Sequence, residues 1–415
     1  MVNRNTSKRW RKGKQIFVLL AVMILFSAAL FALGYADAAT GGGIALNKKN
    51  VTLTVGKTQK LKVKKLPKNA KVTWKSSKKS VASVSRKGLV KAKKAGKATI
   101  RCKVKYRKRK TIVLQCKVTV KKKTAKKKSI VYMTTDITPE GLMAVYKALN
   151  YEPKGKVAVK VSTGEPPASN YLDPELIKDL VQHVNGTIVE CNTAYGGDRS
   201  STAMHRQVAE EHGFTKIAKV DIMDSAGSMT LPIKDGKHLK ENYVGKHFAD
   251  YDSFLVLSHF KGHAMAGFGG AIKNISIGIA SSKGKSYIHS GGTSTSGFGG
   301  EQDAFLESMA EAGKSVSDSL GKGKNIVYIN VMNNLSVDCD CDGNPAKPKM
   351  KDIGILASTD PVALDQACVD LVYKQKNGDG ASLVKRIESR NGLLTLEYAE
   401  KINLGSRSYQ LKSVK

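Results

Sequence analysis

The sequence predicts a multidomain chain: a small all-β sandwich followed by an α/β domain with a mostly parallel sheet. Apolar and polar residues alternate over residues 42–121, whereas short apolar runs alternate with helical stretches over 129–415. The charge changes at the same place. Of the 70 Lys and Arg in the 415 residues, 38 lie in residues 1–128 beside a single acid, Asp37, and the remainder is nearly neutral. We therefore expect two domains with separate roles, joined by a basic linker at 122–128.

Residues 1–38 have the features of a secretory signal. Six basic residues lie within positions 1–14, and the 20 residues at 16–35 carry no charge. Residues 36–38 (Ala-Asp-Ala) then supply the small-x-small pattern of a cleavage site. The apolar run is almost long enough to span a bilayer, so an uncleaved membrane anchor is the alternative. Both alternatives predict an extracytoplasmic protein, either secreted or membrane-anchored.

The alternation over residues 42–121 is typical of strands with one buried face, and turn signals separate the strands as in a sandwich. Cys102 and Cys116 fall on the inward side of the last two strands. A disulfide between them and two buried free thiols both fit this placement. The pattern W-x-S-S…V-A-x-V-S…G-x-V…G-x-A-x-I, which begins at Trp74, resembles the group-2 bacterial immunoglobulin-like (Ig-like) domains. That resemblance implies a spacer or adhesive module of a surface protein.

The same segment is very basic. Between Ala39 and Lys128 there are 32 basic residues and no acid. Such a surface favours a polyanion, either an anionic cell-wall polymer or a membrane surface, and the alternative is a solvated face without a partner. We expect no nucleic acid partner, because only Trp74 and Tyr106 are aromatic and no stacking pattern is present.

Residues 129–415 alternate between apolar runs and helical stretches, which predicts helices on both faces of the sheet. Strands are expected at Ser129–Thr134, Val157–Val161, Thr187–Cys191, Ser253–Leu257, Ile326–Val331 and Ile353–Leu356. Helices are expected at Pro139–Leu149, Pro174–Val184, Ser200–His212, Glu301–Leu320 and Pro361–Tyr373. Ligands of such folds bind at the carboxyl ends of the strands. Polar clusters follow the expected strands at 162–165, 192–193, 258–259, 333–334 and 358–360.

The segment 257–290 holds the densest group of chemically active residues. It contains His259, His263, Lys273 and His289, together with the glycines Gly267, Gly269 and Gly270. Glycine allows the backbone to approach a ligand closely. Three histidines and a lysine after a buried strand predict a ligand or metal site, and a hydrogen-bonded structural cluster is the alternative.

A second cluster lies at 338–343, with the sequence D-C-D-C-D-G. The spacing puts the sulfurs of Cys339 and Cys341 within reach of one metal ion or of each other. A calcium loop is not expected, because the twelfth position from Asp338 is Lys349 rather than Glu. A soft-metal or redox role and a structural loop remain the alternatives.

The stretches SHFKGHAMAGFGGAIKNISIG, NTAYGGDRSSTAMH, CDCDGNPA and DIGILASTDPVALDQA resemble the uncharacterised Fe–S center proteins (domain of unknown function 362). Many members of that family carry a ferredoxin-like insert after the histidine that matches His289. This chain has GGTSTSGFGGEQDAF there, without a cysteine. We therefore do not expect a ferredoxin-type iron–sulfur cluster of its own.

The segment G-F-G-G-x-x-K is also similar, more distantly, to nickel-pincer lactate racemases. In those enzymes a lysine anchors the nickel cofactor, a catalytic histidine precedes it by ten residues, and a nickel-binding histidine follows it by sixteen. His263, Lys273 and His289 have these spacings. The glycine register is offset, and the loop after Val161 has no arginine to bind a carboxylate.

From these observations we expect a cell-envelope protein whose α/β domain is a metal- or cofactor-dependent enzyme acting on a small-molecule ligand. His263 and Lys273 are the expected catalytic residues. The expected cofactor-binding residues are Gly267, Gly269, Gly270, Lys273 and Asn192, and the expected ligands of a transition metal are His259, His289, Cys339 and Cys341. The alternatives are a non-catalytic cell-surface binding protein and a redox accessory protein that uses the C-x-C pair.

Overall fold

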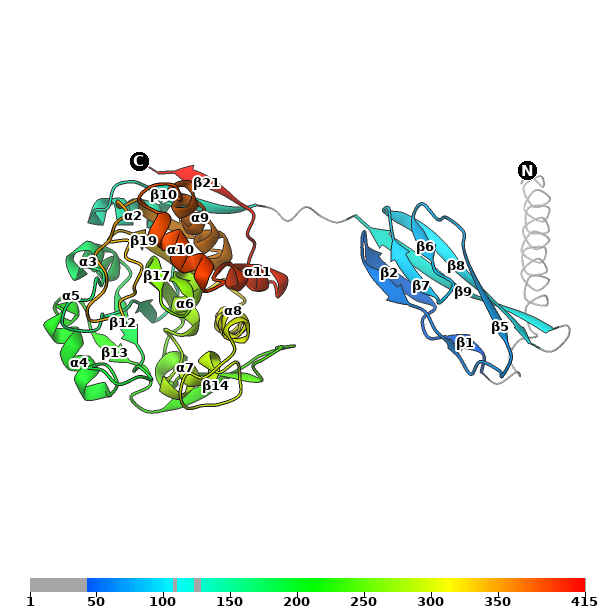
Figure 1. Ribbon diagram of the computed structural model, residues 1–415, viewed down its shortest axis with the longest axis horizontal. Helices are drawn as coiled ribbons and strands as arrows, with labels where there is room; N and C mark the ends of the chain where they lie inside the picture. The colour runs from blue at the N-terminus through cyan, green and yellow to red at the C-terminus, as the bar shows by residue number, and fades with distance from the viewer. Residues whose placement is uncertain (1–42, 107–109, 123–127, 415) are drawn as a thin grey trace, which may run out of the picture. The chain divides into compact units, whose positions relative to one another are not determined.

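The computed structural model of the protein describes residues 43–106, 110–122 and 128–414 (Figure 1). The chain divides into two compact units, residues 1–125 and 126–415. The predicted secretory signal at 1–38 lies outside the described residues. Across the ranges that are described, no helix combines the length and the apolar character needed to cross a bilayer.

In the described residues of the first unit the regular elements are all strands, as the alternating sequence of residues 42–121 predicts. A four-stranded sheet has the order β2-β9-β8-β5, a three-stranded sheet has the order β3-β7-β6, and β1 pairs with β4. Inward residues of β8 such as Ile100 and Val104 are buried, while Arg101, Lys103 and Lys105 between and after them are exposed. The strands are β1 (Ala45–Leu46), β2 (Asn50–Thr54), β3 (Thr58–Lys60), β4 (Val63–Lys64), β5 (Lys71–Ser76), β6 (Ala82–Val84), β7 (Leu89–Ala92), β8 (Gly96–Tyr106) and β9 (Lys110–Lys121).

Cys102 and Cys116 are both buried in this core as free thiols. The register explains why they do not pair. Cys102 lies opposite Leu114, and Cys116 lies opposite Ile100, so the two cysteines are offset along the hairpin. Burial raises the pKa of Cys102 to about 11. The sequence left open a disulfide or two buried free thiols, and the structure has two buried free thiols.

The second unit has an eight-stranded sheet in the order β13-β12-β11-β16-β19-β20-β10-β21. All neighbouring strands are parallel except at β20, which is antiparallel to both β19 and β10. The predicted mostly parallel sheet is thus confirmed. Its strands are β10 (Ser129–Thr134), β11 (Val157–Lys160), β12 (Gly186–Glu190), β13 (Val220–Ile222), β16 (Ser253–His259), β19 (Ile326–Met332), β20 (Gly354–Ser358) and β21 (Tyr409–Ser413).

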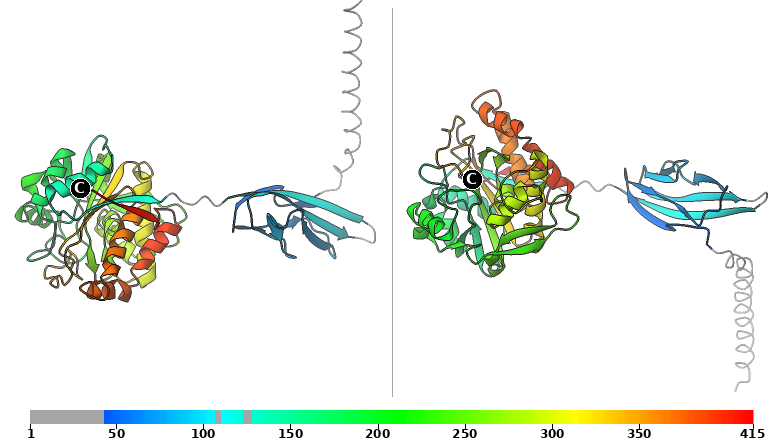
Figure 2. Two further views of the ribbon diagram at one scale, coloured as in Figure 1. Left: turned by 90° about the horizontal axis from the view of Figure 1, so that it is seen from above. Right: turned by 60° about the horizontal axis from the view of Figure 1, so that its bottom comes forward.

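Helices cover both faces of this sheet (Figures 1 and 2). The helices are α2 (Pro139–Ala148), α3 (Pro174–His183), α4 (Thr202–Glu211), α5 (Phe214–Ile217), α6 (Ala271–Ser276), α7 (Ser282–His289), α8 (Gln302–Ser319), α9 (Pro361–Lys374), α10 (Ala381–Ser389) and α11 (Leu393–Lys401), with a 3-10 helix at Lys246–Asp250. In β16, Phe254 and Val256 belong to the core with α6, α8 and α9, whereas Leu255 and Leu257 belong to the core with α2 and α3. The strand is therefore buried on both sides, which accounts for its uninterrupted apolar sequence.

Two hairpins complete the unit: β14 (Ser228–Pro232) with β15 (Glu241–Gly245), and β17 (Lys261–His263) with β18 (Gly267–Gly269). The second hairpin follows β16 directly and leads into α6. The glycine-rich segment of the sequence is thus a tight β-hairpin followed by a short helix.

The position of β20 corrects one prediction. The polar cluster Ser358-Thr359-Asp360 was expected beside the other strand ends. Because β20 is antiparallel, this cluster lies at the opposite edge, where Ser358 pairs with Tyr328 near the start of β19. Asp360 there accepts hydrogen bonds from the backbone of Val362 and Ala363 and so caps α9.

Asp365 of α9 positions α6, the helix that carries Lys273. Its carboxylate accepts hydrogen bonds from the backbone N–H groups of Ala271 and Ile272 and from the Asn330 amide. Gly270 precedes the helix, and a Cβ atom there would lie 2.5 Å from the Asp365 carboxylate. The glycine is therefore needed for the close approach of the two helices.

We predict that Asp365→Ala lowers the free energy of unfolding by about 2–4 kcal/mol, because it leaves two buried backbone N–H groups without an acceptor. Urea unfolding followed by circular dichroism measures the change. Asp318→Ala is the matched control, since Asp318 pairs only with Lys314 at the surface, and its loss should be within about 0.5 kcal/mol. Equal losses in the two variants would contradict this role of Asp365.

Candidate functional site

A cavity of about 340 Å³ lies at the carboxyl ends of β11, β12 and β16. This is the edge where ligands bind in parallel α/β sheets. Strand ends, the β17–β18 hairpin, α6, α7 and the loop after β19 all contribute to its wall. Its charged residues and cysteines are Lys160, Glu190, Cys191, Arg199, Lys261, Lys273, Lys285, Cys339, Asp340 and Cys341.

Glu190 is the electrostatic centre of this wall. It is 4 % exposed and lies 2.8 Å from the Lys160 ammonium and 3.4 Å from the Arg199 guanidinium. Burial alone would raise the pKa of Glu190, but Lys160, His205 and Arg199 together hold it at about 2. Arg199 also pairs with Glu165 at 2.9 Å, so Lys160 and Arg199 are both neutralised within the protein.

Two further cavity lysines have no such neutralisation. Within the part of the chain that the structure describes, neither Lys273 nor Lys285 forms an ion pair with a carboxylate. The Lys285 ammonium donates only to the carbonyls of Ala280 (2.6 Å) and Cys191 (3.4 Å). Burial, reinforced by the charges of Lys160, Arg199 and Lys285, lowers the pKa of Lys273 to about 8. The cavity therefore has an excess of positive charge that nothing in its wall offsets.

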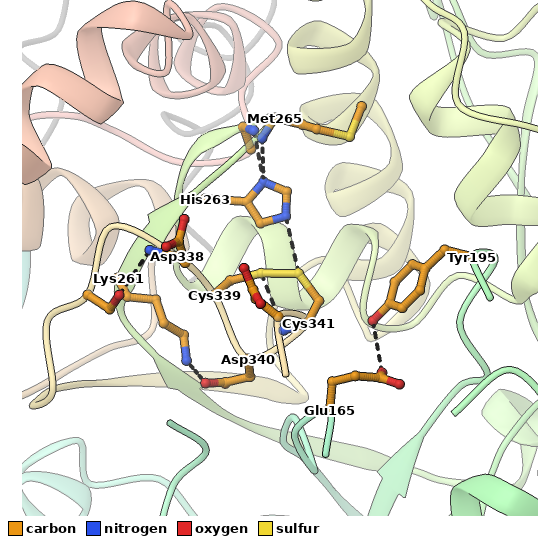
Figure 3. The surroundings of a disulfide bond; sticks show 12 residues. Glu165, Tyr195, Lys261, His263, Met265, Asp338, Cys339, Asp340 and Cys341 are labelled. Atoms are coloured by element: carbon orange, nitrogen blue, oxygen red, sulfur yellow. Dashed lines mark hydrogen bonds and ion pairs between the residues drawn. A yellow bond between two sulfur atoms is a disulfide. The ribbon is translucent and has the colours of Figure 1, made fainter. Parts of the chain in front are cut away.

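His263 on β17 is held in one tautomer (Figure 3). Its Nδ1 accepts hydrogen bonds from the backbone N–H groups of Met265 (3.1 Å) and Ala266 (2.9 Å). The ring proton must then be on Nε2, which lies 3.8 Å from the Cys341 sulfur. Burial and the charge of Lys273 keep the pKa of His263 far below its ordinary value, so the ring is neutral. His263 is thus a hydrogen-bond donor toward the cavity.

His289 on α7 has the opposite arrangement. Its Nδ1 donates to the Lys285 carbonyl at 2.7 Å, which leaves a lone pair on Nε2. The ring stacks on Phe305 and meets the edge of Phe298, at centroid distances of 4.5 and 4.6 Å. Burial lowers the pKa of His289 to about 4. A neutral imidazole with a lone pair beside the cavity is suited to bind a metal or to accept a proton.

His259, expected as a metal ligand, has both ring nitrogens engaged inside the protein. Nε2 donates to the Asn333 carbonyl at 2.6 Å, and Nδ1 lies 2.6 Å from the Lys261 ammonium. Lys261 in turn contacts the Asp340 carboxylate, as Figure 3 shows. His259 therefore orients Lys261 and Asp340, and it offers no lone pair to an ion.

Cys339 and Cys341 are joined by a disulfide in the cavity wall. The ligand atoms of His263, Cys339 and Cys341 lie within 4.8 Å of one another, a spacing at which three side chains can hold a metal ion. The two cysteines of the C-x-C pair therefore lie beside His263, close enough for the three residues to belong to one site. Of the two pairings that the spacing allows, with one metal ion or with each other, the structure has the sulfurs bonded to each other.

The other predicted site residues are divided between the cavity and its surroundings. Gly269 and Gly270 line the cavity beside Lys273. Gly267 adopts a positive φ of 82° and instead packs against the backbone of Ile387 and Gly392. The side-chain amide of Asn192 donates a hydrogen bond to the Thr202 hydroxyl, and its backbone N–H donates to the Asp224 carboxylate. Asn192 therefore supports the strand ends and does not line the cavity.

Sequence reasoning missed five charged residues of the wall: Lys160, Glu190, Arg199, Lys261 and Lys285. A signal was present for two of them. Lys160 ends the apolar run VAVK, and Glu190 ends the run TIVE. A charge that closes a buried parallel strand points to the edge where ligands bind. Arg199 and Lys285 belong to a loop and a short helix whose positions the sequence pattern did not reveal.

Comparison with known families gives two matches. Residues 42–114 match the Bacterial Ig-like domain (group 2), as the sequence predicted. Residues 157–370 match the family described as Domain of unknown function (DUF362), and this range covers more than half of the chain. The chain belongs to the DUF362 family. The matched range includes all the charged residues of the cavity, so the cavity is part of the DUF362 domain.

Among solved structures, the chain is similar to the lactate racemase apoprotein of Thermoanaerobacterium thermosaccharolyticum, with 15% identity and a TM-score of 0.36. The likeness covers 59% of this chain and 57% of the racemase, so the chain spans little more than half the length of that enzyme. A protein from Thermotoga maritima matches with 11% identity and a TM-score of 0.33, over 65% of this chain and 60% of that one. The S-layer protein SbsC matches 22% of this chain and 14% of its own, with 20% identity and a TM-score of 0.17. No curated protein matches the chain.

We predict that Glu190→Gln lowers the free energy of unfolding by about 3–5 kcal/mol at pH 7, because it leaves Lys160 and Arg199 buried with less counter-charge. The depressed pKa means that the stabilisation by Glu190 is complete above its ordinary pKa of 4.5 and is lost as the pH falls toward 2. Urea unfolding at pH 7 and at pH 3 measures both effects. Glu175→Gln, which removes only an exposed pair with Lys178, is the control, and a loss no larger than in this control would refute the prediction.

Proposed function

We propose that the DUF362 domain is an enzyme that binds a small anionic molecule in this cavity and acts on it through Lys273. The observation that carries the proposal is a pair of lysines, the buried Lys285 and the half-buried Lys273, which line the cavity without a carboxylate partner among the described residues. A bound carboxylate or phosphate would supply the missing negative charge. The cost of burying these lysines is then offset only when a ligand is bound.

The cavity contains the groups that such chemistry needs. A lysine whose pKa is about 8 is partly a neutral amine near neutral pH, and can serve as a base or as a nucleophile toward a carbonyl. His263 presents an N–H group that can stabilise negative charge developing on a substrate oxygen. Its Nδ1 is occupied by two backbone donors, so we assign His263 the role of a hydrogen-bond donor and not that of a base.

His289 is the residue that could hold a metal-bearing cofactor. Its Nε2 lone pair and the free amine of Lys273 fit the metal-binding and anchoring roles that the racemase resemblance implies. A metal bound there would supply a Lewis acid beside the substrate. The metal- or cofactor-dependent enzyme expected from the sequence is thus the specific form of this proposal, and of the two histidines expected as ligands it keeps His289 and drops His259.

Reductive trapping tests the proposal. We predict that a small 2-oxo acid with cyanoborohydride attaches covalently to Lys273 of the full-length protein, and that peptide mass spectrometry locates the adduct. Because the pKa of Lys273 is lowered, the neutral amine becomes populated as the pH rises through about 8 rather than through 10.5, and the yield should follow that rise. A neutral ketone of the same size should react more slowly, because Lys285 has no charge to bind.

Lys273→Arg should abolish the adduct, and Lys283→Arg, which changes an exposed lysine, should leave it unchanged. Labelling of Lys273 no faster than that of surface lysines, or equal yields from the acid and the ketone, would contradict the proposal. If the 2-oxo acid binds but Lys273 does not react, the result favours the alternative function, a non-catalytic cell-surface binding protein. The redox alternative depends on a different feature, the Cys339–Cys341 disulfide.

For the Ig-like unit we propose a positioning role through a polyanion of the cell envelope, in a protein that is secreted or anchored to the membrane. Like charges lie directly opposite each other on the outer face of its larger sheet: Lys71 is opposite Lys105, and Lys75 is opposite Arg101. Such pairs destabilise a sheet unless an anion lies between them. The sequence from Ala39 to Lys128 contains no acid that could do this. A group-2 bacterial Ig-like domain, which is typical of surface proteins, supports the same location.

We predict that the full-length protein co-sediments with an anionic polymer, and that binding falls steeply between about 0.05 and 0.5 M salt, as counter-ion screening requires. Purified anionic wall polymer and vesicles of anionic lipid form the two arms and identify the source. Replacing Lys71, Lys75, Arg101 and Lys105 by Gln should weaken binding at least tenfold. Four Lys→Gln changes on the exposed surface of the DUF362 domain are the control, and binding that is insensitive to salt would refute the prediction.

A further inference from the structure

The Cys339–Cys341 disulfide is the one disulfide among the described residues, and both of its sulfurs belong to residues of the cavity wall. Cys102, Cys116, Cys191 and Cys368 are buried free thiols. Burial raises the pKa of each of them, which makes them unreactive. Two cysteines thus differ from the other four in both bonding and location, and they adjoin the chemically active part of the domain.

The surroundings of this disulfide favour a thiolate as its product. His263 Nε2–H lies 3.8 Å from the Cys341 sulfur and donates toward it. The cavity that both cysteines line also holds Lys273 and Lys285, whose charges have no carboxylate partner among the described residues. A hydrogen-bond donor and nearby cations stabilise a departing thiolate and so speed the opening of a disulfide.

The same contact argues against a metal ion held jointly by His263 and the two cysteines. A metal would need the lone pair of His263 Nε2, and the ring proton would then have to move to Nδ1. Two backbone N–H groups already point at Nδ1, from Met265 and Ala266, and leave no room for that proton. His263 is therefore arranged to donate to sulfur, which is what thiol chemistry requires.

We propose that Cys339–Cys341 is a redox-active disulfide that undergoes exchange with small anionic thiols in the cavity. The thiolate of the small molecule attacks the Cys339 sulfur, the bond between the protein sulfurs breaks, and Cys341 leaves as a thiolate that accepts the hydrogen bond from His263. A second thiolate attacks the mixed disulfide and releases Cys339. Two thiols are thereby oxidised to one small-molecule disulfide, and the protein disulfide is reduced to a dithiol with uptake of their two protons.

The cavity determines the class of partner. Its volume of about 340 Å³ admits a small molecule, and Cys339 is only 7 % exposed, so a cysteine on the surface of another protein does not reach it. The unpaired lysines favour a thiol that also carries a carboxylate or sulfonate. The reaction also runs in reverse, so the dithiol form reduces small disulfides of the same charge. This inference does not rest on the proposed function, because neither step uses the Lys273 amine as a base or nucleophile.

The test uses the full-length protein equilibrated with 2-mercaptoethanesulfonate or with cysteamine, which carry opposite charges. Alkylation of thiols and peptide mass spectrometry then give the reduced fraction of Cys339 and Cys341. We expect the folded protein to be reduced by both thiols and at least tenfold faster by the anionic one, while Cys191 and Cys368 remain unlabelled. Cys339→Ser should remove the reaction, and Cys368→Ser should leave it unchanged.

His263 is a positioning residue in this scheme, and its variants separate that role from a structural one. His263→Phe should lower the equilibrium constant for reduction about tenfold, which is the size expected for loss of a hydrogen bond to a charged sulfur. His263→Gln restores an N–H donor and should recover most of the loss. Three results would overturn the proposal: a disulfide that thiols reduce only after unfolding, equal rates with the two thiols, or reduced protein that binds one equivalent of zinc or nickel through both cysteines.

Discussion

The buried carboxylate of Glu190 is the interaction on which the cavity depends. It ends β12 and lies between Lys160, which ends the adjacent β11, and Arg199 from the loop that follows. Without it, Lys160 would line the cavity with no carboxylate partner among the described residues, and Arg199 would keep only its pair with Glu165. With it, Lys160 and Arg199 become part of the wall, and the charge that is left over belongs to Lys273 and Lys285. The function that we propose for the site rests on this imbalance.

A second constraint concerns the direction of side-chain hydrogen bonds. His263 and His289 are both neutral and both adjoin the cavity, but backbone contacts give them opposite tautomers. One presents an N–H group and the other a lone pair. The roles of donor and acceptor are thus set by local backbone geometry, in the β17–β18 hairpin for His263 and in α7 for His289. Sequence spacing gave the two histidines different expected roles but did not indicate their tautomers.

Much of the fold was predictable because periodicity reports burial directly. The alternation in β8 and β9 and the apolar runs of β11, β16 and β19 were assigned correctly, and α3 and α9 begin at Pro174 and Pro361, as expected. The antiparallel direction of β20 was not predictable, since a short buried strand looks the same in either direction. The segment with His263, Lys273 and His289 was found from its composition. Arg199, which pairs with Glu190, and Lys285 were missed because a loop and a short helix bring them to the cavity only through tertiary contacts.

The central claim is that the cavity is an anion site created by two lysines that have no carboxylate partner among the described residues. Anomalous diffraction from crystals of the full-length protein soaked in bromide tests it without knowledge of the natural ligand. The account predicts a strong anomalous peak in the cavity beside the ammonium groups of Lys273 and Lys285, and its loss in Lys285→Met. Bromide bound only to lysines on the surface, with no peak in the cavity, would contradict the account.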